Sequence, residues 1–407
     1  MRIGILSKNY AAKRLFLNKL ANATYKDIRF YNYYLWKNAH LWFLKIIGKL
    51  NMSPEEQASK LFYDYKAILP TKCDLYHFFN TINYSKKQPW VISVESGVPW
   101  PLEVIRCVES SNADLSSIKN NRYVKRALYY LSLPNCRGLI ALSKCSQNIQ
   151  LEILNQFPEY KEQIVKKLIT LYPPQDLIIK SISEKINYTK KSKKFTFIYV
   201  GRDFFRKGGR ETLQVLSELK KKYDFNLILI SNLRIDEIKY LRSSHDIEDT
   251  KKLINDNLSW IEFHESLPNN EVLEKIKQSN VALLPTWMDT YGYSVIECQA
   301  CGTPVISTSL RALTETNDDK VGWLIKVPVN KLNNPIHNTK EEQDIFHDTL
   351  SKELYKTIEY VLLHTDEVQT KSQNCLKRIE KYHDPQKYAK KLDLIYNNKI
   401  SELRNNV

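Results

Sequence analysis

The sequence predicts an α/β protein with two doubly wound domains. Three observations support this prediction. Short β-rich apolar runs alternate with helical stretches in both halves of the chain, which is typical of mostly parallel sheets covered by helices. The alternation is interrupted by Pro173, Pro174 and the polar, Lys-rich stretch after them. The length of 407 residues is enough for two complete hydrophobic cores.

The first domain is expected to span residues 1–175, followed by a linker over 176–194. Apolar runs predict strands at 2–6, 75–79, 91–94, 138–142 and 164–171. Helical spacing predicts helices at 13–20, 54–65, 123–133 and 146–156, the last of them capped by Ser143 or Ser146.

The second domain is expected to span residues 195–384, and a final segment, 385–407, follows it. Its predicted strands are 195–200, 226–231, 260–263, 281–284 and 305–307. Its predicted helices are 211–222, 270–278, 294–300, 348–364 and 366–383, with an irregular loop at 330–345 and a last helix at 386–400.

A strand, a loop and a helix opening follow one another between residues 281 and 308. The backbone N–H groups of Tyr291, Gly292 and Tyr293 are placed where such a helix begins, and a helix N-terminus favours an anion such as a diphosphate. An ordinary strand–helix–strand unit with a charged first turn gives the same pattern, so this stretch alone leaves both interpretations open.

Two carboxylates bracket this helix opening, Asp289 in the loop and Glu297 within the helix. Carboxylates beside an anion site need donors of their own, and sugar hydroxyl groups can supply them. The pair therefore indicates a ligand that combines phosphate with sugar.

A second basic segment follows the strand at 195–200, where Gly201 and Arg202 precede Lys207 and Gly208. The planar guanidinium of arginine and the mobile ammonium of lysine together suit a diphosphate. Either residue alone is compatible with a basic turn after a strand.

Both segments resemble those of family 4 retaining glycosyltransferases of the GT-B fold, which carry a carboxylate-x7-carboxylate signature and a Gly-Arg-x4-Lys-Gly element. The resemblance implies two Rossmann-like domains that face a central cleft, with the C-terminal helix crossing back to the first domain. It also implies a nucleotide-sugar donor, retention of anomeric configuration, and no metal or cofactor. On this basis Arg202 and Lys207 bind the donor diphosphate, Asp289 contacts sugar hydroxyls and Glu297 contacts the ribose.

The chain departs from the family pattern at several positions. Asp289 stands where the family usually has glutamate. Glu95 stands where a histidine near the transferred sugar is expected, which makes Glu95 a candidate for contact with the donor sugar or the acceptor hydroxyl. His264 lies in the expected nucleobase-contacting loop, where Glu265 replaces a common glycine.

The net charge of +16 belongs mainly to the first half of the chain. Residues 1–190 carry 28 Lys and Arg against 14 Asp and Glu, and the remainder carries 33 against 31. An anionic membrane surface, a phosphate-bearing acceptor or nucleic acid would fit this charge, and so would a merely solvating surface. Of these partners we do not favour nucleic acid.

An odd number of scattered cysteines, seven in all, indicates a reducing compartment. We interpret Cys298 and Cys301 as packing residues rather than zinc ligands, because no second pair accompanies them. No apolar run is long enough for a membrane span or a signal peptide, so we expect a cytoplasmic protein, with the inner face of the cell membrane as its place of contact.

Residues 32–50 combine aromatic and basic side chains at helical spacing. Such a helix can lie on anionic lipid, or it can dock on its own sheet. One face would carry Leu35, Ala39, Trp42, Phe43, Ile46 and Leu50, and another would carry Lys37, Lys45 and Lys49.

The resulting hypothesis is a glycosyltransferase that moves a sugar from a nucleotide-diphosphate sugar to a glycan or lipid-linked acceptor in bacterial surface polysaccharide or lipopolysaccharide synthesis. Two other classes stay open. One is a non-catalytic GT-B-like binding subunit, which the departures at Asp289 and Glu95 would suit. The other is a glycosyltransferase that modifies nucleic acid, which would bind DNA with strong salt dependence.

Overall fold

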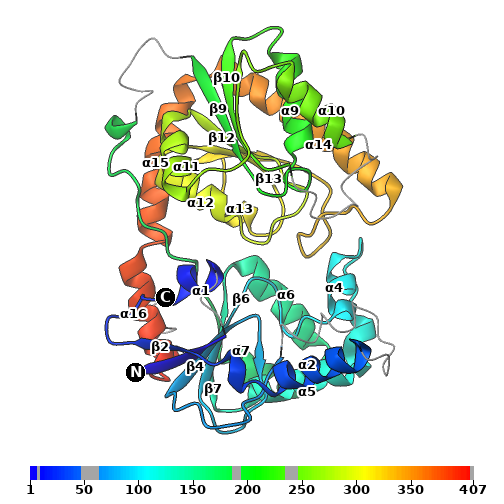
Figure 1. Ribbon diagram of the computed structural model, residues 1–407, viewed down its shortest axis with the longest axis vertical. Coiled ribbons are helices and arrows are strands. Elements are labelled where there is room, and N and C mark those ends of the chain that lie inside the picture. Colours follow the sequence, from blue (N-terminus) through cyan, green and yellow to red (C-terminus); the bar gives the residue numbers. More distant parts are fainter. Residues whose placement is uncertain (7–9, 47–63, 186–193, 234–245, 404–407) are drawn as a thin grey trace. The chain divides into compact units, whose positions relative to one another are not determined.

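The computed structural model describes residues 1–6, 10–46, 64–185, 194–233 and 246–403. The chain divides into two compact units (Figure 1). Unit 1 contains Met1–Pro174 together with Pro385–Val407, and unit 2 contains Gln175–Asp384. Each unit is built on one all-parallel, six-stranded sheet.

The sheet of unit 1 has the strand order β2-β1-β4-β6-β7-β8. Its inner strands are buried on both faces, which is why they read as continuous apolar runs such as LYHFF and WVISV. The strands are β1 (Arg2–Ile5), β2 (Thr24–Asp27), β4 (Leu75–Phe79), β6 (Trp90–Val94), β7 (Cys136–Ala141) and β8 (Leu168–Thr170). A small separate pair is formed by β3 (Asp64–Tyr65) and β5 (Ile82–Asn83).

Helices connect these parallel strands in unit 1. They are α1 (Tyr10–Leu15), α2 (Tyr33–Ile46), α4 (Leu102–Glu109), α5 (Arg122–Ser132), α6 (Lys144–Asn155) and α7 (Pro158–Val165). The expected cap of α6 is Ser143, whose side chain accepts a hydrogen bond from the Ser146 N–H at 2.9 Å.

The last helix, α16 (Pro385–Tyr396), returns to unit 1, which confirms the expected crossing of the C-terminal helix. It packs so closely over β7 that a Cβ at Gly138 would lie 2.6 Å from the Ile395 side chain. The buried His77 holds the same end of the helix: Nδ1 lies 2.6 Å from the Tyr396 hydroxyl and Nε2 lies 2.9 Å from the Ser93 hydroxyl. Burial lowers the pKa of His77 to about 3, so this imidazole is a neutral structural group.

The sheet of unit 2 has the strand order β11-β10-β9-β12-β13-β14, the order of dinucleotide-binding domains. Its strands are β9 (Phe195–Val200), β10 (Phe225–Ile230), β11 (Ile261–His264), β12 (Val281–Leu284), β13 (Val305–Thr308) and β14 (Gly322–Ile325). The chain reverses its direction of travel across the sheet between the adjacent strands β9 and β12.

Helices cover both faces of this sheet (Figure 1). On one side lie α9 (Gly209–Leu219), α10 (Asp246–Asn255) and α14 (Lys340–Leu363), and on the other lie α11 (Asn269–Gln278), α12 (Tyr293–Ala300) and α15 (Asp366–Tyr382). A buried contact joins α9 to α14, because His347 Nδ1 lies 2.8 Å from the Glu211 carboxylate. Although burial raises the pKa of Glu211, His347 and Arg210 outweigh this effect, and the pKa stays below its ordinary value.

Several predicted elements in the described residues were partly wrong, among them the last helix, predicted at 386–400, which ends at Tyr396. The helix predicted at 13–20 is α1, which ends at Leu15, and Asn18 adopts a left-handed conformation (φ 58°). The strand predicted at 164–171 begins only at Leu168, because α7 starts at Pro158 and continues to Val165. The irregular loop predicted at 330–345 ends early, because Thr339 and Glu342 form a capping box that starts α14.

The short edge strands β2 and β14 and the helix α10 were not predicted from the sequence. Most of the helix predicted at 54–65 lies outside the described residues, and its last two positions form β3.

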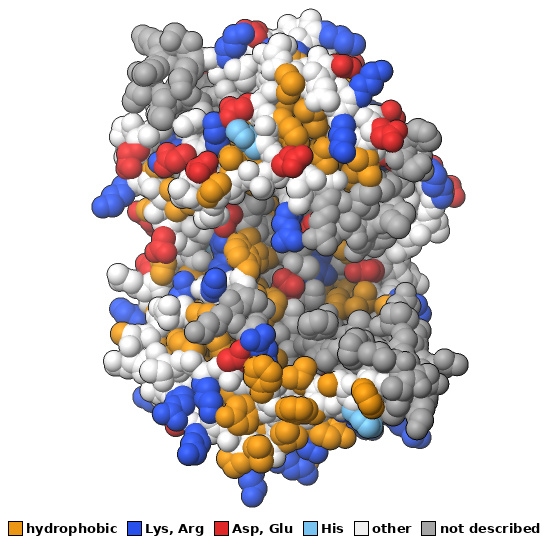
Figure 2. Space-filling view, in the orientation of Figure 1, with side chains coloured by type: hydrophobic (Ala, Val, Ile, Leu, Met, Phe, Trp, Pro, Cys, Tyr) orange, Lys and Arg blue, Asp and Glu red, His pale blue; other side chains and the backbone are white. Residues whose placement is uncertain are grey.

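Helix α2 coincides with the aromatic and basic stretch. The side chains of Trp36 and Phe43 are 55% and 56% exposed, and Lys37 is exposed as well. In Figure 2, hydrophobic side chains gather over the lower part of unit 1, with Lys and Arg side chains at their margins. The predicted positions from 47 to 50 lie outside the described residues. Within the described chain, no helix has the length and apolarity that crossing a bilayer requires.

The beginning of the expected linker belongs to unit 2 and packs against α12. The N–H groups of Ile178 and Ile179 donate to the Ala300 carbonyl at the end of α12. Lys185 is fully buried there, and its Nζ donates to Thr303 Oγ1 at 2.6 Å. Burial lowers the pKa of this ammonium to about 8 from its ordinary value of 10.5.

This burial predicts a particular pH dependence of stability. Between the folded pKa of about 8 and the unfolded value of 10.5, the unfolded state binds more protons, so stability rises as pH rises. We compare the free energy of unfolding of the wild type with that of Lys185→Met. Between pH 7 and pH 9.5 the difference should shift in favour of the wild type by about 2 kcal/mol. Urea unfolding at the two pH values measures this gain.

The exposed Lys180 of the same segment provides the control. Lys180→Met should follow the wild type at both pH values. Parallel behaviour of the wild type and Lys185→Met would contradict the assignment of a buried, destabilised charge at residue 185.

Candidate active site

The two segments singled out in the sequence meet where β9 and β12 end. These strands are neighbours in the sheet and parallel, so the loops that follow them leave from the same edge. In open α/β sheets this point of reversal is where ligands bind. The sheet order of unit 2 therefore brings together residues that lie more than 80 positions apart in the chain, as the 82-residue separation of Lys207 and Asp289 shows.

The loop after β9 approaches the end of β12 very closely. Gly208, the N-cap residue of α9, has a φ of 75°. A Cβ at this position would lie 1.9 Å from the Pro285 carbonyl oxygen. Only glycine fits, because any side chain would meet the backbone of the other loop in addition to the strain of a positive φ.

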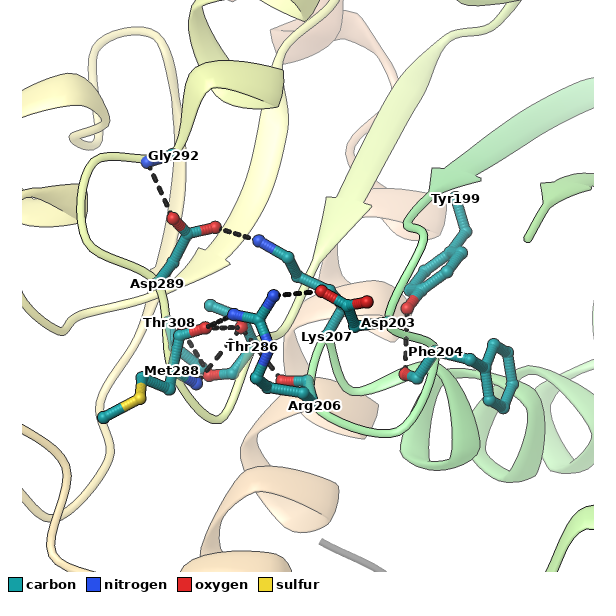
Figure 3. Close-up of polar contacts among 10 residues, drawn as sticks. All are labelled: Tyr199, Asp203, Phe204, Arg206, Lys207, Thr286, Met288, Asp289, Gly292 and Thr308. Carbon is teal, nitrogen blue, oxygen red and sulfur yellow. Dashed lines mark hydrogen bonds and ion pairs between the residues drawn. The ribbon is translucent and has the colours of Figure 1, made fainter. Parts of the chain in front are cut away.

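Arg206 joins the two loops with both its backbone and its side chain (Figure 3). Its carbonyl accepts a hydrogen bond from the Thr286 hydroxyl at 3.0 Å. The same carbonyl also accepts the Trp287 N–H at 2.9 Å. Its guanidinium donates to the Met288 carbonyl at 2.9 Å and pairs with Asp203 in its own loop.

Lys207 and Asp289 form an ion pair between the tips of these loops (Figure 3). The second carboxylate oxygen of Asp289 accepts a hydrogen bond from the Gly292 N–H at 3.0 Å. Burial raises the pKa of Asp289, but the charge and hydrogen bond of Lys207, with the Gly292 N–H, keep it below the ordinary value. Asp289 is therefore ionised at neutral pH.

The other residues predicted for the two loops and for α12 differ in exposure. Arg202 is exposed, and within the described chain its side chain has no hydrogen-bond or ion-pair partner. Tyr291 is buried, with its ring centroid 5.1 Å from that of the half-buried Tyr293. Glu297 is half-buried on α12, and Gly292 takes the left-handed N-cap position with a φ of 77°.

His264 ends β11 and is held by a neighbouring carboxylate. Its Nε2 lies 2.7 Å from Glu262 Oε1, which also pairs with Lys275 at 2.5 Å. Burial raises the pKa of Glu262, yet Lys275 and His264 outweigh it and keep the pKa below its ordinary value. Glu262 therefore carries the negative charge that orients the His264 ring.

The part of the chain that contains both loops is similar to known proteins. Residues 181–356 match the family described as glycosyl transferases group 1.

The chain is also similar to curated proteins. One is a GDP-Man:Man(3)GlcNAc(2)-PP-Dol alpha-1,2-mannosyltransferase of Xenopus laevis, 26% identical over 206 residues, which are 49% of this chain and 39% of the relative. An uncharacterized glycosyltransferase of Methanocaldococcus jannaschii is 24% identical over 250 residues, 60% of this chain and 57% of the relative. The chain thus spans less than two thirds of the length of these relatives.

Solved structures extend the similarity to both units. A glycosyltransferase from Rickettsia africae covers 98% of this chain and of its own with a TM-score of 0.58 at 12% identity. Anabaena HepE in complex with UDP covers 100% of both chains with a TM-score of 0.53 at 13% identity. At such identities the similarity establishes the fold, which is GT-B with two Rossmann-like units.

Unit 1 of this GT-B chain presents Glu95 where β6 ends. The loop after β6 is clamped by α6: Ser146 Oγ donates to the carbonyls of Val94 and Ser96, and Gln150 both accepts from the Val98 N–H at 2.8 Å and donates to its carbonyl at 2.9 Å. The Glu95 N–H donates to the Asn80 side chain at 3.3 Å. Glu95 is half-buried, and these hydrogen bonds hold its loop in place.

Asp203, Arg206 and Thr286 were missed in the sequence although they organise the site. Arg206 directly precedes Lys207, and its charge was a usable signal. Nothing in the sequence indicated that its partners would be the carbonyl of Met288 and the hydroxyl of Thr286, because these contacts depend on the adjacency of β9 and β12.

No group of three or more His, Cys, Asp or Glu side chains in the described ranges is arranged to hold a metal ion. Cys298 and Cys301 are buried in the core of unit 2. Burial raises the pKa of the Cys301 thiol to about 12, so it stays protonated at neutral pH.

The contact between Gly208 and Pro285 predicts a large effect of a single methyl group. Gly208→Ala should lower the free energy of unfolding by about 2–4 kcal/mol, because the loops must separate and a positive φ is strained for alanine. Urea unfolding measures the loss. Gln214→Ala, at an exposed position of α9, is the control and should change stability by less than about 0.5 kcal/mol. Equal stability of the two variants would refute the close approach.

Proposed function

We propose that this protein is a retaining, metal-independent glycosyltransferase that moves a sugar from a nucleotide-diphosphate sugar to a glycan or lipid-linked acceptor. The observation that carries the proposal is the convergence of Lys207, Asp289 and the N-terminus of α12 at the point where β9 and β12 part. Unit 2 would hold the donor.

The proposed chemistry needs positive charge at the diphosphate. Breaking the bond between the sugar and the phosphate leaves negative charge on the departing nucleoside diphosphate, and cations fixed in a partly buried site stabilise that charge. Lys207 and Arg202 would provide it, with the dipole of α12. These groups would do what a divalent ion does in other enzymes, which is the physical basis for proposing that none is required.

The other contacts follow the same assignment. Glu297 on the first turns of α12 would bind the ribose hydroxyls, and His264 at the end of β11 would lie against the nucleobase. Glu95 would contact the transferred sugar or the acceptor hydroxyl from unit 1. Anabaena HepE has been captured with UDP-glucose, which supports a nucleotide-sugar donor for this fold.

The acceptor proposal rests on the relatives and on charge. The name of the Xenopus mannosyltransferase gives a PP-Dol-linked oligosaccharide as its acceptor. A lipid-linked acceptor would be met at a membrane, and the basic first half of the chain and the exposed aromatic side chains of α2 are compatible with an anionic one. We propose bacterial surface polysaccharide or lipopolysaccharide assembly, at the inner face of the cell membrane, as the setting.

Nucleotide binding tests the donor site. A nucleoside diphosphate that binds only the native state should raise its stability by about 2.7 kcal/mol at a hundredfold excess over Kd. We expect a thermal shift with one of UDP, GDP or ADP, or with its sugar conjugate, that is lost in Arg202→Met and Lys207→Met. Lys221→Met, an exposed lysine after α9, is the matched control and should keep the shift.

A folded wild type that responds to none of these nucleotides would contradict the proposed function and favour a non-catalytic binding subunit. A shift that persists in Lys207→Met would move the diphosphate site away from the loop after β9.

The membrane contact is tested with vesicles. Replacing Trp36 and Phe43 by serine should weaken binding to phosphatidylglycerol vesicles by about fivefold or more, because both exposed rings would enter the lipid interface. Cosedimentation measures the bound fraction. Leu363→Ser, an exposed apolar residue of unit 2, should leave it unchanged. Equal binding of all three proteins would exclude α2 from the contact.

A further inference from the structure

Protein groups engage both carboxylate oxygens of Asp289. Oδ1 accepts the Gly292 N–H at 3.0 Å, and Oδ2 pairs with Lys207 Nζ. The two side chains of the ion pair are only 12% and 17% exposed. Figure 3 shows the carboxylate lying between the helix opening and the ammonium.

The frame around this pair holds both backbones in place. Lys207 is fixed by the hydrogen bond from its N–H to the Asp203 carbonyl at 2.9 Å, and Arg206 next to it is bound to the loop of Asp289. The Thr286 hydroxyl bridges the Arg206 and Met288 carbonyls at 3.0 and 2.8 Å. With both loops fixed, the short aspartate side chain still reaches the ammonium.

A lysine side chain loses considerable rotamer freedom when it is held in one place. In the free protein, Asp289 imposes that order on Lys207 before any ligand arrives. One of the three ammonium donors is used in the pair, and two stay available for phosphate oxygens. An ordered cation lowers the entropic cost of binding an anion.

We propose that Asp289 is a positioning residue for Lys207, whose ammonium it orders for the donor diphosphate. This inference rests on the proposed function, since it presumes that Lys207 binds the diphosphate. It is compatible with the sugar contact that the family resemblance implied for Asp289, because each carboxylate oxygen can accept a further hydrogen bond. It also predicts that the residue matters for a nucleoside diphosphate that carries no sugar.

A double-mutant cycle tests the proposal with sugar-free probes, UDP, GDP and ADP, of which the one that binds the wild type most tightly is used. Asp289→Asn removes the charge and keeps an oxygen to accept the Gly292 N–H. We expect it to raise the Kd of the nucleoside diphosphate about tenfold, because Lys207 must then be ordered on binding. In the Lys207→Met background the same substitution should change Kd by less than about twofold. Calorimetry on the full chain gives the four constants.

Several outcomes would overturn the inference. Unchanged or tighter binding by Asp289→Asn would show that the carboxylate does not position the ammonium for phosphate. If Asp289→Asn weakened binding of the corresponding nucleotide sugar and left binding of the sugar-free nucleoside diphosphate unchanged, Asp289 would be a sugar ligand only. An equal loss in the Lys207→Met background would indicate a merely structural role. The proposed function fails separately, if the wild type binds none of the three probes or Lys207→Met binds as tightly as the wild type.

Discussion

The candidate site depends on the contact between the loop after β9 and the loop after β12. Gly208 allows the two backbones to touch, since a Cβ there would lie 1.9 Å from the Pro285 carbonyl oxygen. Arg206 then binds the second loop through its carbonyl and its guanidinium. The Lys207–Asp289 pair forms on this frame, and neither side chain could reach its partner from loops that were free to separate.

A similar principle organises unit 1, where buried polar groups fix a loop and a terminal helix. Ser146 and Gln150 of α6 bind the backbone that follows β6, and this loop presents Glu95. His77 and Tyr396 join β4 to α16 in the core. Unpaired buried polar groups are costly, so each of these contacts selects one arrangement of its segments.

Local signals in the sequence accounted for much of the fold. The inner strands were predictable because parallel strands buried on both faces are continuous apolar runs, as Phe195–Val200 shows. The edge strand Thr24–Asp27 is half exposed and lacks this pattern, which explains why it was missed. The start of α14 was encoded by Thr339 and Glu342, but a polar stretch before them concealed it.

The sequence by itself determined the class of fold, the family resemblance and the identity of the basic and acidic residues at the site, because these follow from hydrophobic periodicity and from the spacing within single loops. Only the tertiary structure decided what those residues touch. Asp289 and Lys207 lie 82 positions apart, and their pairing follows from the adjacency of β9 and β12. The Asp289 carboxylate also accepts the Gly292 N–H at the opening of α12, because a side chain of that length reaches both the ammonium and the helix.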